Sequence, residues 1–148
     1  MKVAIGCDHA GMAMKNQIVP VLEELNIEIM DFGTNVEESC DYPDYGEKVS
    51  EVVSNGSIER GILICGTGIG MCIVANKFPG VRAALCCEDY SAKMSRLHND
   101  ANILVLPGRI IDGNTAKRIV KTWLKTDFEG GRHQRRLDKI KAIESKLK

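Results

Sequence analysis

The sequence has no long apolar segment, no excess of one charge and few aromatic residues. No run approaches the ~18 consecutive apolar positions that are typical of a membrane-spanning helix. The apolar stretch Val3–Cys7 is too short for the core of a signal peptide. Twenty basic residues balance twenty acidic ones, and aromatic residues make up only 5% of the chain. Because nucleic-acid and membrane-surface binders usually carry a basic excess, we expect a cytoplasmic protein that binds neither.

Three familiar sequence motifs are also missing. The cysteines, at positions 7, 40, 65, 72, 86 and 87, include no C-x-x-C pair. We therefore expect reduced thiols, with no disulfide framework and no zinc site. The glycine-rich segment Gly66–Gly70 does not have the G-x-x-x-x-G-K-[ST] pattern of a P-loop. It also lacks the G-x-G-x-x-G spacing of a dinucleotide-binding turn.

Short apolar runs alternate with stretches of helical character along the chain. The expected strands are Val3–Cys7, Ile27–Phe32, Gly61–Cys65, Arg82–Cys86 and Asn102–Leu106. The expected helices are Met12–Leu25, Asp44–Asn55, Gly70–Lys77, Asp89–Leu97, Asn114–Thr126 and Gln134–Lys148. Continuous apolar strands indicate burial on both faces of a parallel sheet, and the alternation predicts an α/β architecture. The length suits one domain, which we expect to span residues 1–148.

The last expected helix, Gln134–Lys148, has an apolar stripe but no strand after it. Leu137, Ile140, Ile143 and Leu147 follow one another at helical spacing. The stripe packs either on the domain itself or on a second subunit.

The segment from Ile62 to Gly70 is the most informative part of the chain. A buried strand ends in the thiol of Cys65 and runs directly into three glycines within five residues. Glycines leave backbone N–H groups uncovered, and a helix beginning near Gly70 adds a positive dipole end. A thiol beside such donors suits a reaction that makes and then stabilises an oxyanion. The alternative is an ordinary strand-to-helix turn with a structural cysteine.

Polar residues follow most of the other strands. Asp8 and His9 come directly after the first strand, where they could also serve only as a turn and helix cap. If the strand order is 2-1-3-4-5, the order reverses between the first and third strands. Ligands bind at such a switch point, at the carboxyl ends of the strands. Asp8, His9, Cys65 and the glycine loop would then share one cleft.

A second candidate segment lies near the C-terminus. Arg132 and Arg136 are four residues apart, so they share one helix face just after Gly130 and Gly131. Two guanidinium groups on one face suit a phosphate, which each can bind through two hydrogen bonds. The alternatives are a solvated basic helix and a nucleic-acid patch.

Seven short segments follow one another in a fixed order over residues 3 to about 140. They are Asp8–Gly11, Asp41–Tyr45, Cys65–Met71, Ala75–Lys77, His98–Asn102, Pro107–Arg109 and Gly131–His133. Together they resemble the ribose-5-phosphate isomerase B family, whose superfamily includes galactose-6-phosphate isomerase subunits and allose-6-phosphate isomerases. The resemblance implies a Rossmann-like three-layer domain with a five-stranded parallel sheet. It also implies a homodimer or dimer of dimers, with the last helix packed on the partner, and aldose–ketose isomerisation without metal or cofactor.

The resemblance also implies a role for each site residue. Cys65 would be the base that moves a proton between C2 and C1 of the open-chain sugar. His98 would be the acid that helps to open the furanose ring. The enediolate oxygens would be held by Thr67 and by the amides of Gly66, Gly68, Ile69 and Gly70. The sugar hydroxyls would be bound by Asp8, Tyr42 and Asn99, and the phosphate by His9, Arg109, Arg132 and Arg136. The family's site is shared by two subunits, and we expect His98, Asn99 and Arg109 to come from the neighbour.

Several other functions remain open at this stage. A six-carbon aldose 6-phosphate could be the substrate in place of ribose 5-phosphate. A non-catalytic sugar-phosphate sensor could use the same fold, although binding alone does not need Cys65. A thiol-exchange protein is disfavoured by the absence of C-x-x-C.

Overall fold

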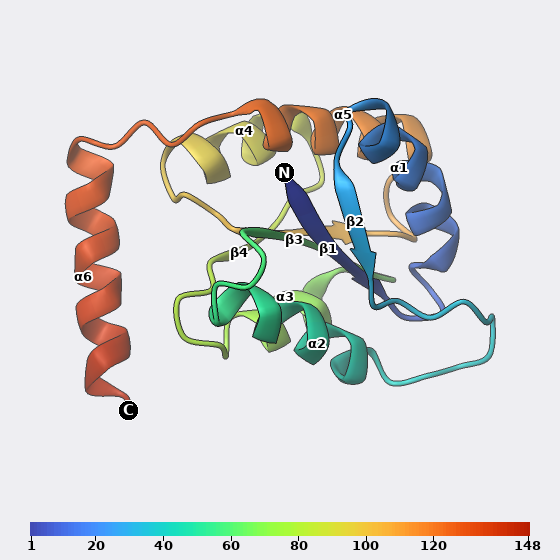
Figure 1. The fold of residues 1–148 in the computed structure, drawn as a ribbon, viewed down its shortest axis with the longest axis horizontal. Coiled ribbons are helices and arrows are strands. Elements are labelled where there is room, and N and C mark those ends of the chain that lie inside the picture. The colour runs from blue at the N-terminus through green and yellow to red at the C-terminus, as the bar shows by residue number, and fades with distance from the viewer.

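Five parallel strands form the central sheet of a computed structural model that describes residues 1–148 (Figure 1). The strands are β1 (Lys2–Cys7), β2 (Glu28–Asp31), β3 (Arg60–Cys65), β4 (Ala83–Leu85) and β5 (Ile103–Pro107). Each expected strand is present, with ends that differ by at most one residue. Residues in β1, β3 and β5 are almost all buried, which confirms the prediction of strands covered on both faces. The prediction is wrong for the two edge strands, because β2 and β4 remain partly exposed.

The strand order is β2-β1-β3-β5-β4, so the expected order 2-1-3-4-5 is wrong at one edge. β5 lies between β3 and β4 and pairs with both. An inner position requires a strand that is apolar on both faces and long enough to pair on both sides. Ile103–Pro107 meets this requirement, whereas β4 has only three residues, each half-buried. The predicted switch point between β1 and β3 is unaffected by this exchange.

Six helices complete the fold, and the first five cover the two faces of the sheet. They are α1 (Met12–Glu24), α2 (Tyr42–Ser54), α3 (Ile69–Ala75), α4 (Asp89–Leu97), α5 (Gly113–Lys125) and α6 (Arg132–Lys146). Alternate strand residues point to opposite faces. One set packs with α1, α4 and α5 around Trp123, and the other packs with α2 and α3. The α/β three-layer architecture is therefore confirmed. No helix combines the length and apolarity needed to cross a membrane.

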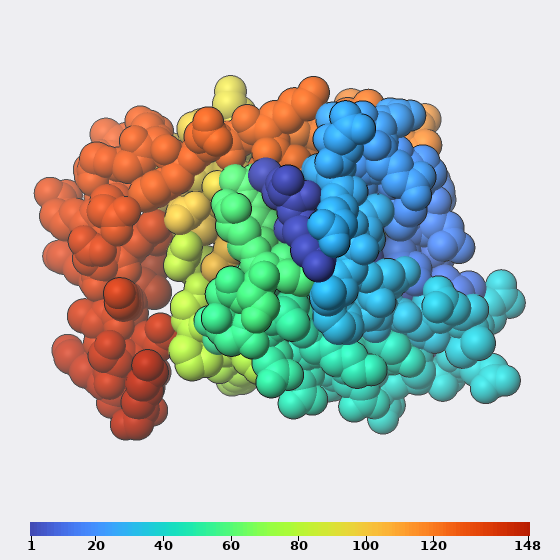
Figure 2. All heavy atoms as spheres, in the orientation of Figure 1, coloured from blue at the N-terminus to red at the C-terminus, as the bar shows by residue number.

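Helix α6 stands to one side of the layered body (Figure 1). Leu137 is buried, but Ile140, Ile143 and Leu147 are exposed. A groove of about 710 Å³ separates these side chains from the segment after α3, and Figure 2 shows it beside the red helix. One polar contact crosses it, from the Gly80 N–H to Glu144 Oε1 at 2.9 Å. The helix therefore covers little of its own apolar stripe by packing on its own chain.

Candidate active site

A cleft of about 440 Å³ opens at the carboxyl ends of β1 and β3, where the strand order reverses. It contains nine of the predicted site residues. They are Asp8, His9, Tyr42, Cys65, Gly66, Thr67, Ile69, Gly70 and Arg109. Ala10 and Ile73 complete the lining. The topology thus brings a carboxylate, an imidazole, a thiol and a glycine loop together, as the sequence predicts.

The glycine loop presents backbone donors to this cleft. Gly68 has φ of 76°, a left-handed conformation that favours glycine. The N–H groups of Gly66, Thr67 and Gly68 donate no hydrogen bond within the chain. Such free, adjacent donors can hold an oxygen that carries negative charge. The Ile69 N–H is less available, because it donates to Thr67 Oγ1 at 3.3 Å.

Tyr42 packs directly on the glycine loop. A Cβ atom added to Gly70 would lie 2.6 Å from the Tyr42 ring, so only glycine allows the ring this close approach. Tyr42 itself begins α2 and is 39% exposed, with its neighbour Pro43 in the first turn of the helix. The tyrosine therefore forms one wall of the cleft and remains accessible to a ligand.

Cys65 is the thiol at the base of the cleft. It is 5% exposed, and its Sγ makes no hydrogen bond with another group. All six cysteines are free, as the sequence predicts. Burial raises the pKa of Cys7 and of Cys86 to about 11, so neither thiol ionises readily near neutral pH. Cys87, next to Cys86 in the chain, is exposed.

Asp8 and His9 are held by local hydrogen bonds. Asp8 is buried, and its Oδ1 accepts from the Gly11 N–H at 3.0 Å, so it caps the turn before α1. His9 Nδ1 accepts from the backbone N–H of Cys40 at 3.2 Å. A neutral His9 therefore carries its proton on Nε2, which can donate to a ligand oxygen. No local sequence pattern indicates this contact with Cys40, because it joins residues 31 positions apart.

Arg109 lies in the same cleft as Cys65 of its own chain. Its backbone N–H donates to Gly66 O at 3.0 Å, and its Cδ lies 3.4 Å from the place a Gly66 Cβ would occupy. The expectation that Arg109 comes from a neighbouring subunit is therefore wrong. The cause is the exchange of β4 and β5, which puts the end of β5 beside the end of β3.

The opposite end of the strands, away from the Cys65 cleft, carries the predicted residues His98, Asn99, Arg132 and Arg136. Helix α4 follows β4 and returns toward the start of β5, so His98 and Asn99 lie near the amino ends of the strands. α5 returns the same way, and α6 begins there with Arg132. The six-residue strand β3 separates the two edges by roughly 17 Å at the rise of a parallel strand. One chain thus carries two separate groups of site residues.

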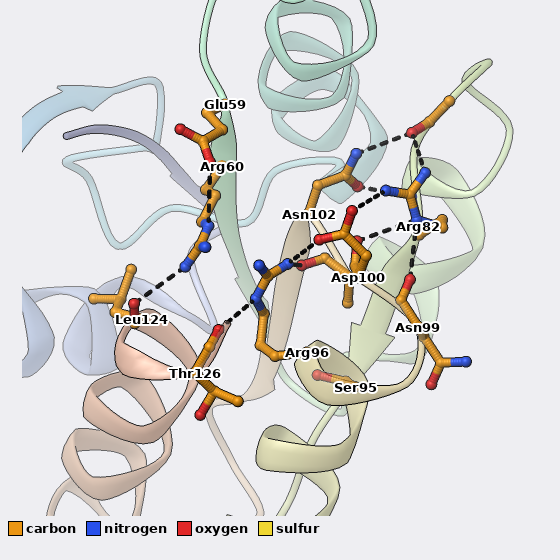
Figure 3. A network of polar contacts seen from close by, with 12 residues as sticks. Glu59, Arg60, Arg82, Ser95, Arg96, Asn99, Asp100, Asn102, Leu124 and Thr126 are labelled. Carbon is orange, nitrogen blue, oxygen red and sulfur yellow. Dashed lines mark hydrogen bonds and ion pairs between the residues drawn. The ribbon is translucent and has the colours of Figure 1, made fainter. Parts of the chain in front are cut away.

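An arginine network fixes the loop that carries Asn99 (Figure 3). The Asp100 carboxylate accepts from Arg96 Nη1 at 2.9 Å and from Arg82 Nη2 at 3.2 Å. Arg82 Nε also donates to the backbone oxygen of Asn99 at 3.0 Å. Asp100 has φ of 44°, a conformation that aspartate tolerates better than most residues. These contacts hold the turn after α4 in one conformation.

His98 stacks on a second histidine, His133, for which the sequence predicts no role. Its ring lies 4.1 Å from that of His133, with 13° between the planes. The Glu129 carboxylate is 3.9 Å from His98 Nε2 and 3.8 Å from His133 Nε2. Burial lowers the pKa of His133, and the nearby His98 lowers it further. The start of α6 is thereby attached to the end of α4.

Comparison with known proteins agrees with this arrangement. A family model described as ribose/galactose isomerase matches residues 3–140. The chain belongs to the ribose/galactose isomerase family. Ribose-5-phosphate isomerase B of Escherichia coli K12 is 49% identical to it over 98% of this chain and 97% of the relative. The structure of Clostridium thermocellum ribose-5-phosphate isomerase B superposes with a TM-score of 0.97 at 53% identity, covering 100% of both chains.

Members of this family differ in the sugar that their names state. A D-erythrulose-4-phosphate isomerase of Pectobacterium atrosepticum is 40% identical over 95% of this chain and 93% of its own length. Both names state an isomerase that acts on a phosphorylated sugar, but the two sugars have different numbers of carbon atoms.

Proposed function

We propose that this chain is an aldose–ketose isomerase that interconverts D-ribose 5-phosphate and D-ribulose 5-phosphate through an enediolate. The observation that carries the proposal is the placement of the Cys65 thiol in one cleft with Gly66 and Thr67, whose amides donate no hydrogen bond within the chain. High identity over whole chains to relatives named for this reaction supports the choice of sugar.

The chemical step is a proton transfer between adjacent carbons. The Cys65 thiolate takes the proton from C2 of the open-chain aldose, and the electron pair moves so that the aldehyde oxygen becomes an enediolate oxyanion. The proton of the C2 hydroxyl passes to the oxygen on C1, which becomes a hydroxyl. The Cys65 thiol then returns its proton to C1 as the oxygen on C2 becomes the ketone, and the thiolate is regenerated. Since no atom or electron is gained or lost overall, the reaction needs no redox cofactor.

The glycine loop stabilises the charge that this step creates. The amides of Gly66, Gly68 and Gly70, with the Thr67 hydroxyl, hold the enediolate oxygens, and the Ile69 amide joins them when it leaves Thr67 Oγ1. Donors placed in advance around developing charge lower the barrier, because they need not reorganise during the reaction. Asp8 and Tyr42 orient the hydroxyl groups of the sugar from the two sides of the cleft.

The remaining residues bind the phosphate and open the sugar ring. His9 and Arg109 lie in the Cys65 cleft, and both can donate to phosphate oxygens. Arg132 and Arg136 supply two further guanidinium groups, and His98 donates the proton that opens the furanose. Asn99 binds a hydroxyl. In their own chain, these four residues (Arg132, Arg136, His98 and Asn99) lie at the opposite end of the strands from the Cys65 cleft. They therefore reach such a cleft only in another subunit.

A two-fold dimer satisfies this requirement. In a two-fold interface the same patch of each subunit faces the other, so two complementary groups of residues meet twice. The residues at the amino ends of the strands in one chain would then face the cleft at the carboxyl ends of the strands in its partner. Two complete sites would result. The exposed stripe of α6 continues from this group and would be covered by the same interface.

A sugar phosphate of another length is the second candidate substrate. The Pectobacterium relative, which is named for a four-carbon sugar, favours keeping this alternative open. Formation of ketose should be measured with ribose 5-phosphate, erythrose 4-phosphate, allose 6-phosphate and galactose 6-phosphate in parallel. Fastest turnover of the five-carbon sugar is the expected result. Fastest turnover of another sugar would keep the mechanism and change the substrate, and binding without any turnover would identify a sensor.

A further inference from the structure

The cluster of His98, Glu129 and His133 has the composition of a metal site. Two imidazoles and one carboxylate form a ligand set that binds zinc in enzymes, with a fourth position left open. The three ligand atoms all lie within 4.8 Å of one another. Glu129 Oε2 lies between the two histidines, 3.9 Å from Nε2 of His98 and 3.8 Å from Nε2 of His133.

A buried nitrogen in this cluster lacks a partner. His133 is 3% exposed, and its Nε2 makes no hydrogen bond. A buried polar atom without a partner is destabilising, so such atoms are uncommon. Burial also lowers the pKa of His133, which favours the neutral imidazole that metals bind. The proposed isomerase mechanism uses neither Glu129 nor His133.

To bind one ion, the ligand atoms must move closer together and the His98 ring must turn. With metal–ligand bonds of about 2.0–2.2 Å, ligand atoms in a tetrahedral site are roughly 3.3–3.5 Å apart. The nitrogen–oxygen distances here are 3.8 and 3.9 Å. The His98 ring must also tilt out of its stack so that its Nε2 points at the same ion as His133. His98 and Glu129 have side chains that are 37% and 56% exposed, which leaves room for this tilt and for a water ligand.

We propose that His98, Glu129 and His133 form an inhibitory binding site for a divalent transition-metal ion such as Zn²⁺. The inhibitory part rests on the proposed function, because the ion takes the lone pair of His98 Nε2 and removes this residue as the acid that opens the sugar ring. The site regulates the enzyme without a metal having any part in the reaction.

Direct binding tests the site independently of catalysis. Zn²⁺ is titrated into the metal-free protein by calorimetry, for wild type, Glu129→Gln and a control, Glu51→Gln, in an exposed residue of α2. Loss of an outer-shell partner weakens metal sites by about 10–100-fold. Loss of a ligand in Glu129→Gln should therefore weaken binding by at least about tenfold, and Glu51→Gln should bind like wild type. Equal affinity in all three proteins would overturn the proposal.

Isomerase rates test the inhibition. Each protein is compared with its own zinc-free rate, and EDTA is added afterwards to restore it. Wild type and Glu51→Gln should lose activity at the zinc concentration at which calorimetry shows binding, and Glu129→Gln should need at least about ten times more. Binding at the site without a loss of rate would overturn the inhibitory role. If no sugar phosphate turns over, the proposed function fails, and calorimetry still decides the metal site.

His133→Gln, checked for folding by circular dichroism, should weaken zinc binding in calorimetry as Glu129→Gln does.

Discussion

The thiols of this chain lie in different kinds of environment, and the environment decides their chemistry. Cys7 and Cys86 lie in the core, and burial raises the pKa of each to about 11. Cys65 also follows an apolar strand, but it lines a cleft beside unpaired amides. The same residue type thus serves as a small apolar side chain at two positions and as the proposed base at the third.

Alkylation should distinguish these thiols. At neutral pH, iodoacetamide should modify Cys65 and abolish turnover, and a saturating sugar phosphate should protect both. Cys7 and Cys86 should remain unmodified, because a thiol with a pKa of about 11 is almost entirely protonated. Peptide mass spectrometry gives the extent of modification at each site. Full modification of Cys65 with no loss of rate would contradict its role as base.

Asp100 has a structural role, which stability measurements should reveal. Asp100→Ala removes the carboxylate that accepts from both Arg82 and Arg96, and Arg96 is buried. We expect the free energy of unfolding to fall by about 1–3 kcal/mol in urea denaturation, since charge-assisted partners are left unpaired. Asp138→Ala is the matched control, because its carboxylate contacts only exposed Gln134. A change below about 0.5 kcal/mol for both would show that the network is not stabilising.

At the scale of elements, several features could be predicted from the sequence and others could not. The alternation of apolar runs and helical stretches predicted every strand and helix within a few residues. It did not reveal the exchange of β4 and β5, because the choice of neighbour depends on strand length and burial in the folded sheet. That exchange also placed Arg109 in the Cys65 cleft of its own chain. The long-range contact of Cys40 with His9 has no local signal at all.

The exposed stripe of α6 should control subunit association. Ile140 and Ile143 are 52% and 56% exposed, and burying each in a dimer would stabilise it by about 1–2 kcal/mol. Replacing both with serine should weaken the dimer at least about tenfold in sedimentation-velocity experiments, without removing Arg132 or Arg136. Val36→Ser, which is also 56% exposed but lies in the loop after β2, should leave association unchanged. An unaltered dimer in the double variant would place the interface elsewhere.

At the scale of the whole molecule, the parallel sheet separates the site residues into two groups. Helices that follow the strands carry the chain back to the amino edge, so His98 and Arg132 lie far from the Cys65 of their own chain. The motifs in the sequence indicate these residues as candidates for the site. The motifs did not reveal at which end of the strands each residue lies, because this depends on where the helix that carries it begins or ends in the folded sheet.

A mixed dimer tests whether two chains share each site. Cys65→Ala and His98→Ala should each have little activity alone. In a dimer of one chain of each kind, one of the two sites keeps both intact residues. Refolding the two variants together should therefore restore about a quarter of the wild-type rate, because random pairing gives half mixed dimers. The rate should remain at the level of the separate variants if each chain builds its own site.

The most direct test of the central proposal is the rate of ribulose 5-phosphate formation from ribose 5-phosphate by wild type and by Cys65→Ala. Binding of the sugar phosphate is measured on the same samples by calorimetry. We predict turnover by wild type, a loss of at least about 100-fold in kcat for Cys65→Ala, and a nearly unchanged Kd. A Cys65→Ala protein that keeps its full rate would contradict the assignment of this thiol as the base.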